Sequence, residues 1–124
     1  MDQDTYDKGL EIRTRVLGED YVKKSISGAT SFNEDFQALT TEYCWGAVWG
    51  REGLSAAQRS MLNIAMLTAL GRDDELRLHV AGALRNGLTP DEIKEVLLQA
   101  AIYCGIPAAN AAFRIARDVI ENNE

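Results

Sequence analysis

The segment 61–70, Met-Leu-Asn-Ile-Ala-Met-Leu-Thr-Ala-Leu, most constrains how this chain can fold. Wound as an α-helix it is apolar on nearly every side, because only Asn63 and Thr68 interrupt it. A helix of that kind is normally surrounded by other parts of a protein. It is too short to cross a bilayer, which takes about 20 predominantly apolar residues. We therefore expect it at the centre of a bundle of helices.

The remaining segments have the same helical periodicity, and none alternates convincingly with a period of two residues. Capping signals and glycines divide the chain into expected helices over residues 6–17, 20–27, 31–47, 55–71, 73–87, 89–104 and 107–121. A length of 124 residues is typical of one domain. We therefore expect a single all-α domain, residues 1–124, built as a bundle of about seven helices.

Specific residues mark four of these helix starts. A serine or threonine followed three residues later by glutamate or glutamine predicts a capping box at Ser31–Glu34, Ser55–Gln58 and Thr89–Glu92. Either Asp73 or Asp74 is expected to cap the helix that follows. The apolar pattern after Thr89 places Cys104 on the inner face of its helix.

The charge and the first residues of the chain exclude several functions. The net charge is −6, so the overall field opposes binding to nucleic acids and to anionic membranes. Met1–Thr5 is acidic and polar, without the basic and apolar regions of a signal peptide. We therefore expect a cytoplasmic protein with neither nucleic acid nor membrane as a partner.

The cysteines and the histidine give little support to a metal or thiol centre. Cys44 and Cys104 lie far apart in the sequence, and no Cys-x-x-Cys motif is present. Two reduced, buried thiols are the default expectation, and a structural disulfide stays open. A single histidine without paired carboxylates at ligand spacing makes a poor metal site, so we expect no metal.

The segment 41–49, Thr-Glu-Tyr-Cys-Trp-Gly-Ala-Val-Trp, is the first candidate for chemistry. At α-helical spacing Glu42 shares a face with Trp45 and Trp49. A carboxyl group beside indole rings loses hydration, which favours its neutral form, and such tuned acids are common in catalysis. The alternative is that both tryptophans belong to the core while Glu42 points to water.

The second candidate is His79, the only histidine of the chain. On a helix it lies on the face of Leu76 and Ala83, within or beside the apolar stripe. A group that titrates near neutrality and points inward is the best general acid or base available here. The alternative is a hydrogen-bonded histidine of the core.

Both candidates lie in blocks that resemble the γ-carboxymuconolactone decarboxylase family, within the alkylhydroperoxidase D-like superfamily. The resemblance covers nearly the whole chain without large gaps, and its blocks are specific when taken together. The matching blocks are residues 6–9, 32–36, 41–49, 63–70, 78–84, 95–99 and 102–109.

The resemblance implies both a fold and a reaction. The fold is that of small all-α chains that assemble into rings, so a homo-oligomer, hexamer or trimer, is expected. The reaction is the cofactor-independent decarboxylation of 4-carboxymuconolactone, a dicarboxylate lactone, to the 3-oxoadipate enol-lactone. This carbon–carbon lyase step belongs to the protocatechuate branch of aromatic catabolism, the β-ketoadipate pathway.

Two other functions remain as alternatives. The peroxidase branch of the superfamily carries Cys-x-x-Cys-x-x-x-His, and counting back from His79 places Arg72 and Glu75 at the two cysteine positions. A peroxidase or thiol redox protein is therefore disfavoured. The other alternative is a non-catalytic helical oligomer or binding module.

The decarboxylation assigns roles to the candidate residues. His79 is the first choice for the oxyanion donor or the proton donor, and Glu42 either orients it or is the protonated acid itself. The expected substrate-binding residues are Arg51 and Arg59 for the second carboxylate, Trp45 and Trp49 for an apolar wall, and Tyr103 as a further donor. The alternatives are a solvated loop cation for Arg51, an ion pair for Arg59 and a core position for Tyr103.

Overall fold

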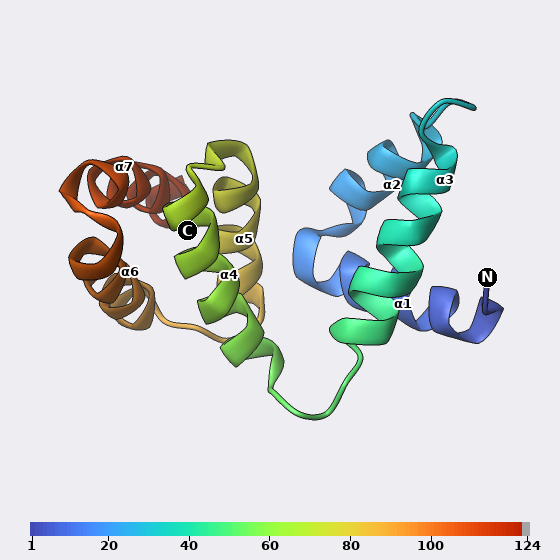
Figure 1. Cartoon of the computed structure of the whole chain (residues 1–124), viewed down its shortest axis with the longest axis horizontal. Coiled ribbons are helices and arrows are strands. Elements are labelled where there is room, and N and C mark those ends of the chain that lie inside the picture. The colour runs from blue at the N-terminus through green and yellow to red at the C-terminus, as the bar shows by residue number, and fades with distance from the viewer. Residues whose placement is uncertain (123–124) are drawn as a thin grey trace. The chain divides into compact units, whose positions relative to one another are not determined.

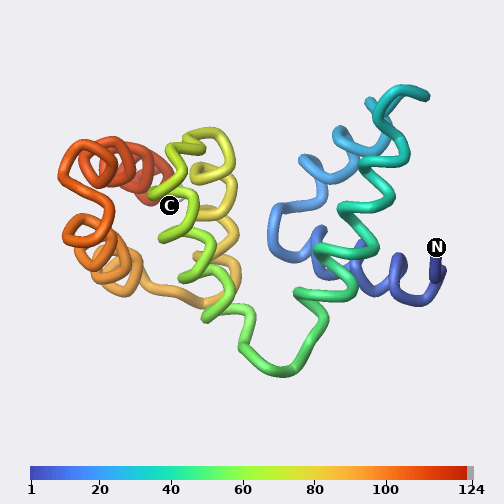
Figure 2. The backbone as a smooth tube through the Cα atoms, viewed as in Figure 1, coloured from blue at the N-terminus to red at the C-terminus, as the bar shows by residue number. Residues whose placement is uncertain are grey.

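The structure is a computed structural model that describes residues 1–122 and divides into two compact units, residues 1–54 and residues 55 onward. Across the described residues the chain forms seven α-helices and one π-helix, with no strand (Figure 1). The prediction of an all-α fold with about seven helices is therefore confirmed. Figure 2 traces the backbone of each unit, with α1 to the π-helix in the first and α4 to α7 in the second.

The first unit contains α1 (Gln3–Leu17), α2 (Glu19–Ser27), α3 (Glu34–Leu39) and the π-helix η1 (Thr40–Val48). Gly18 separates α1 from α2 because its positive φ of 95° is a conformation that side-chain-bearing residues rarely adopt. The backbone runs from α3 into η1 without a break, since Thr40 keeps right-handed helical angles. Within η1 the backbone hydrogen bonds join residues five apart instead of four. At its end, for example, the N–H of Trp49 donates to the carbonyl of Cys44 at 3.0 Å.

Two predictions for this region are wrong. The helix begins after Asn33 rather than through a capping box of Ser31 and Glu34, because the Asn33 Oδ1 instead accepts from the backbone N–H of Thr30 at 2.8 Å. The expected α-helix to residue 47 becomes a π-helix at Thr40. The shared face of Glu42, Trp45 and Trp49 was derived from α-helical spacing, which a π-helix does not keep.

Two elements of the first unit, α1 and η1, cross with their backbones in contact. A Cβ atom built on Gly9 would lie 1.9 Å from the carbonyl oxygen of Thr41, and one built on Gly46 would lie 2.3 Å from that of Thr5. Only glycine fits at both positions, so the two helices approach more closely than side chains normally allow. Beside the crossing, the apolar core of the unit is formed by Ile12, Val16, Leu17, Val22 and Trp45.

A buried arginine joins the three elements around this crossing. Arg13 is only 5% exposed, and its Nη1 donates to the Thr41 Oγ1 at 3.1 Å. The same hydroxyl donates to the carbonyl of Gln37 at 2.8 Å, so the chain of hydrogen bonds links α1, η1 and α3. Burial lowers the pKa of the Arg13 guanidinium.

The second unit contains α4 (Ala56–Leu70), α5 (Asp73–Arg85), α6 (Pro90–Cys104) and α7 (Ile106–Asn122). Helix α4 contacts the other three helices, but each of those also contacts all the others, so the central position predicted for segment 61–70 stays a prediction. The core is formed by Ile64, Leu76, Val80, Ala83, Leu88, Ile93, Leu97, Ala112, Ile115 and Ala116. Part of α4 nevertheless faces outward, at Leu62, Met66 and Leu70.

Caps were predicted for three helices of the second unit, and two of these predictions are confirmed. The capping boxes Ser55–Gln58 and Thr89–Glu92 are both complete, with each side chain bonded to the other residue's backbone N–H. Neither Asp73 nor Asp74 caps α5, which starts after Arg72 without a side-chain cap. Both aspartates lie in the first turn, where negative charge favours the positive end of the helix dipole.

None of the helices among the described residues is long and apolar enough to cross a membrane.

We predict that Gly9→Ala lowers the free energy of unfolding by about 1–3 kcal/mol, the usual cost of overpacking. The added Cβ would force α1 and η1 apart. Alanine's better helix propensity, about 1 kcal/mol, acts in the opposite direction, so a net loss isolates the clash. Urea denaturation measures the change. Gly53→Ala is the matched control, because a Cβ there meets nothing within 4 Å, and equal stability of the two variants would contradict the backbone contact.

Candidate functional site

His79 lies on α5 and is half-buried. Burial lowers the pKa of its imidazole, while the negative charge of Glu75, one turn earlier on the same helix, acts in the opposite direction. The ring is therefore mainly neutral at pH 7. A position between core and surface suits a group that must meet a substrate and still be shielded from bulk water.

Two hydrogen bonds between polar side chains join α4 to α5 and its C-cap residue. The Nδ2 of Asn63 lies 3.4 Å from the Nδ1 of His79, and the Nδ2 of Asn86 donates to the Oγ of Ser60 at 2.9 Å. We call these four residues, Ser60, Asn63, His79 and Asn86, the polar seam. Ser60 and Asn63 lie three apart on α4 and so share one helix face, His79 lies on α5, and Asn86 is the C-cap residue of α5.

Sequence reasoning missed three members of the polar seam. Asn63 was noted only as an interruption of an apolar helix, and Ser60 and Asn86 were not considered. The available signal was the presence of polar residues at positions of α4 that periodicity places inward. Ser60 is fully buried, and a buried hydroxyl normally has a hydrogen-bond partner.

The two candidate arginines lie in different surroundings. Arg59 is half-buried on α4, four residues before Asn63, and so shares the helix face that carries the polar seam. Arg51 lies in the exposed segment after η1, where its backbone N–H donates to the carbonyl of Val48 at 3.1 Å. Of the two, Arg59 is on the same unit and the same helix face as the partner of His79.

In the first unit, Glu42 is half-buried and its carboxylate accepts the backbone N–H of Asp2 at 2.6 Å. The rings of Trp45 and Trp49 stack, with centroids 4.8 Å apart and an angle of 28° between the planes. Trp45 is only 4% exposed and Trp49 is half-buried. The tryptophan pair is therefore one apolar surface, partly within the core of its unit.

The structure thus groups the predicted residues by unit. His79 and Arg59 belong to the second unit, whereas Glu42, Trp45 and Trp49 belong to the first. Direct coupling between Glu42 and His79 stays a prediction. Tyr103, on α6, is 81% exposed, so the alternative of a core tyrosine is wrong.

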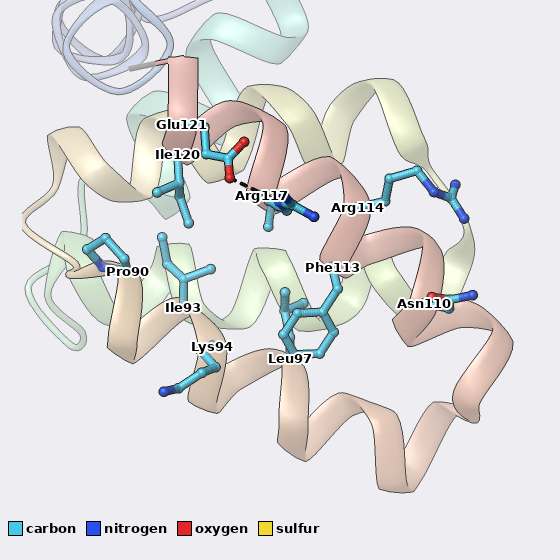
Figure 3. Close-up of a pocket in the computed structure, with 11 residues that line it drawn as sticks. Pro90, Ile93, Lys94, Leu97, Asn110, Phe113, Arg114, Arg117, Ile120 and Glu121 are labelled. Atoms are coloured by element: carbon cyan, nitrogen blue, oxygen red, sulfur yellow. Dashed lines mark hydrogen bonds and ion pairs between the residues drawn. The ribbon is translucent and has the colours of Figure 1, made fainter. Parts of the chain in front are cut away.

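A groove of about 600 Å³ between α6 and α7 contains none of the predicted residues (Figure 3). Ile93, Leu97 and Phe113 form its apolar part. Of the charged residues along it, Arg117 donates to Glu121 at 3.0 Å. No histidine lines this groove, so it offers no imidazole for acid–base chemistry of the kind available at His79.

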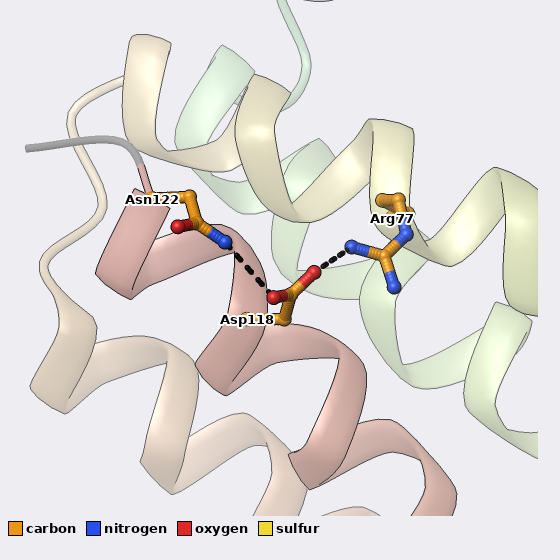
Figure 4. A network of polar contacts seen from close by, with 3 residues as sticks. All are labelled: Arg77, Asp118 and Asn122. Carbon is orange, nitrogen blue, oxygen red and sulfur yellow. Dashed lines mark hydrogen bonds and ion pairs between the residues drawn. The ribbon is translucent and has the colours of Figure 1, made fainter.

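A surface network holds α5, the helix that carries His79, against α7 (Figure 4). Arg77 pairs with Asp118, and the Nδ2 of Asn122 donates to the other oxygen of the same carboxylate at 2.9 Å. Such an exposed pair contributes about 0–1 kcal/mol, so the packing of the two helices depends mainly on their apolar faces.

Cys44 and Cys104 are both unpaired and both exposed, so the expectation that they are buried is wrong. Cys104 lies on the outer side of α6, although periodicity placed it inside. Neighbouring groups desolvate the Cys44 thiol and raise its pKa, with Arg13 opposing the effect. A raised pKa leaves less thiolate at neutral pH, which disfavours a reactive cysteine.

Among residues 1–122, no three histidine, cysteine, aspartate or glutamate side chains come together in an arrangement able to hold a metal ion.

Comparison with known proteins gives consistent matches. Residues 34–118 match the model of the carboxymuconolactone decarboxylase family, from α3 in the first unit to α7 in the second. The 4-carboxymuconolactone decarboxylase of Acinetobacter baylyi is 46% identical over 121 residues, 98% of this chain and 90% of that protein. The nitrosuccinic acid decarboxylase npaB of Metarhizium robertsii is 40% identical over 117 residues, 94% of this chain and 82% of that protein.

We predict that His79 titrates below 6.5, its ordinary value, in the folded protein. Because the unfolded chain then binds the proton more readily, the free energy of unfolding should fall as the pH drops through 6.5 and be unaffected by this group above it. NMR titration of the only histidine measures the pKa directly. His79→Gln is the control for stability, since it should remove this part of the pH dependence. A folded pKa above 6.5 would contradict the prediction.

Proposed function

The chain belongs to the carboxymuconolactone decarboxylase family, and on that premise we propose that it converts 4-carboxymuconolactone to the 3-oxoadipate enol-lactone and CO2. The observation that carries this proposal is the 46% identity, over 98% of the chain, to a relative named for that activity. Both named relatives are decarboxylases, which supports loss of CO2 from a small carboxylic acid as the shared reaction.

The substrate itself supplies the electron sink for this reaction. The bond between the carboxylate and a saturated lactone carbon breaks, and its electron pair moves through the adjacent alkene onto the lactone carbonyl oxygen. CO2 leaves, and the resulting dienolate takes up one proton on the carbon next to the carbonyl. No electrons are gained or lost overall, so neither an oxidant nor a reductant takes part. The protein must desolvate the departing carboxylate, stabilise an oxyanion and deliver a proton.

In this proposal His79 stabilises the oxyanion or donates the proton. Its half-buried position and lowered pKa support a neutral ring that is shielded from bulk water. One well-placed oxyanion donor is typically worth about 3–4 kcal/mol in the barrier, and a positioned acid about 10²–10⁴ in rate.

Arginine side chains are proposed to hold the second carboxylate of the substrate, which remains in the product. We favour Arg59 over Arg51, because Arg59 lies on the helix face that carries the partner of His79. A guanidinium binds a carboxylate with two parallel hydrogen bonds, so it also fixes the orientation of the lactone. In a chain with a net charge of −6, such a local cation is needed to attract a dianion.

Further roles are proposed for Trp45, Trp49, Glu42 and Tyr103. The stacked rings of Trp45 and Trp49 would provide an apolar wall for the departing carboxylate. Glu42 would orient His79 or act as the acid, in addition to accepting the N–H of Asp2. Tyr103, whose side chain is exposed, would be a further hydrogen-bond donor to the substrate.

We also propose that the protein forms a homo-oligomer, a hexamer or trimer. Large apolar side chains are strongly exposed in both units, among them Phe32, Phe36, Ile102 and Ile106. Apolar surface of this extent is typical of protein interfaces. A native mass of three or six times 13.7 kDa by light scattering is the expected result, and a monomeric mass would reject it.

We propose the cytoplasm as the location of the protein. Its two free thiols support this, because the cytoplasm is reducing and keeps thiols from forming disulfides.

The test of the function is to incubate the purified protein, without any added cofactor, with 4-carboxymuconolactone and to measure CO2 release. We expect catalytic release by the wild type and by the Cys44→Ser/Cys104→Ser double variant, with no effect of reductants. Peroxide reduction that the double variant loses would instead support a thiol redox protein. Absence of both activities would support the non-catalytic alternative.

We predict that His79→Ala reduces kcat to less than about one tenth of the wild-type value, given the usual worth of a positioned acid.

Glu42→Gln keeps the shape of the side chain and removes its ionisation, so it should shift the pH–rate profile if Glu42 works with His79. The double variant should then lose less than the product of the single losses. A Glu42→Gln protein with unchanged kcat and pH profile would show that Glu42 is structural and that His79 has another partner.

A further inference from the structure

We propose that Arg13, on α1, is a positioning residue that holds Thr41 and so fixes the π-helical winding of η1. That winding decides where Glu42 and Trp45 lie, because both follow Thr41 in the same helix. The winding is a property of the first unit alone, whereas its catalytic use rests on the proposed decarboxylation.

Arg13 is a buried cation without a carboxylate partner. Its side chain is 5% exposed, its Nε has no hydrogen-bond partner, and no aspartate or glutamate among residues 1–122 forms an ion pair with it. Burial lowers the pKa of the guanidinium, and the opposing effects come from Tyr21, Cys44 and Tyr6, none of which is a carboxylic acid. An arginine stays charged in proteins, and an unpaired buried charge is costly. Packing alone does not explain such a residue, since an apolar side chain would fill the same space at lower cost.

The hydrogen bond that Arg13 does make goes to the start of η1. Its Nη1 donates to the Oγ1 of Thr41 at 3.1 Å, and Thr41 is fully buried. The same hydroxyl donates to the carbonyl of Gln37 at 2.8 Å, and that carbonyl also accepts the backbone N–H of Thr40. A carbonyl oxygen has two lone pairs, so these two donors satisfy it. The N–H of Thr41, which would use this carbonyl in an α-helix, therefore meets an acceptor that is already occupied.

A second buried threonine shows what such a hydroxyl does without an arginine. Thr68, on α4, is 2% exposed, and its Oγ1 donates at 2.8 Å to the carbonyl of Ile64, again four residues earlier. Helix α4 is nevertheless an α-helix from Ala56 to Leu70. A bond from a threonine hydroxyl to the backbone is therefore not enough to produce a π-helix. The bond from Arg13 distinguishes Thr41 from Thr68.

The close crossing of α1 and η1 acts on the same residue. A Cβ atom on Gly9 would lie 1.9 Å from the carbonyl oxygen of Thr41. Gly9 and Arg13 are four residues apart on α1 and so share one face of that helix. Helix α1 thus meets Thr41 at two points, with its backbone at the carbonyl and with the guanidinium at the hydroxyl. Two points of contact fix the rotation of η1 about its own axis, which one alone would leave adjustable.

The winding at Thr41 sets the direction of every side chain that follows in η1. Trp45 is 4% exposed and stacks on Trp49. A π-helix and an α-helix have different numbers of residues per turn. A return to α-helical winding at Thr41 would therefore rotate Glu42 and Trp45 about the helix axis and carry the buried indole towards water.

The first experiment reads the winding without any substrate. Arg13→Met removes the guanidinium and keeps an unbranched side chain, so we expect a free energy of unfolding equal to or above that of the wild type. Trp45 and Trp49 are the only tryptophans of the chain, so fluorescence reports on η1 alone. We expect emission at longer wavelength and stronger quenching by acrylamide, because Trp45 becomes exposed. Emission and quenching identical to the wild type would overturn the proposal.

Thr41→Val removes the other partner of the same bond and keeps the shape of the side chain. It should shift the emission in the same direction, and it provides the answer if Arg13→Met does not fold. The double variant should shift no further than the larger of the single variants, because both changes act through one hydrogen bond. A double variant whose shift is the sum of the two single shifts would overturn the proposal.

The second experiment measures the catalytic use. In Arg13→Met the kcat of decarboxylation should fall about 10- to 100-fold, the usual consequence of slightly misplaced site residues, while KM changes less. A shifted tryptophan emission with an unchanged kcat would overturn the positioning role. If the wild type itself releases no CO2, the fluorescence still decides the winding, and the catalytic use fails together with the proposed function.

Thr68→Val is the matched control. It makes the same chemical change at a buried threonine with the same bond to the backbone, but in an α-helix of the second unit. It should lower stability while tryptophan emission and kcat stay as in the wild type. An emission shift in this variant like that of Thr41→Val would show that general loosening is responsible, and it would overturn the role of Arg13.

Discussion

The packing of α4 against α5 is the constraint on which the candidate site depends. The polar seam joins two helices that both contribute to the apolar core of the second unit, and an unpaired polar group buried there costs about 1–3 kcal/mol. Each member is therefore restricted to an arrangement in which it meets its partner across the interface. The same burial that restricts His79 also lowers its pKa, so orientation and protonation state have one physical origin. The ion pair of Arg77 with Asp118 adds only an exposed link between α5 and α7.

In the first unit, helices pack through direct contact between their backbones. At the crossing of α1 and η1 there is no side chain on either Gly9 or Gly46, so the backbones themselves are in contact. Arg13 and Thr41 connect the elements beside that crossing through hydrogen bonds. The π-helix follows directly from α3 and carries Glu42 and Trp45, and Trp49 is its C-cap residue. Such helices are rare, and short stretches of them are found frequently at functional sites, which agrees with the role proposed for these residues.

The proposed chemistry asks the protein only for functions that amino-acid side chains can supply. The substrate provides its electron sink, so the protein contributes an apolar environment, a donor for the oxyanion and a cation for the second carboxylate. Candidates for these tasks are the tryptophan pair, His79 and Arg59. The family match extends from α3 to α7 and so includes parts of both units.

The sequence by itself determined the helical fold, most helix boundaries and the family, because helical periodicity, capping residues and extended similarity are local or linear properties. It identified the capping boxes at Ser55 and Thr89. It did not determine the π-helix, the outward position of Cys104 or the partner of His79. Those depend on which residues from distant segments fill the space around each side chain. Asn63 and His79 are 16 residues apart, and only the packing of α4 on α5 brings the amide to the ring.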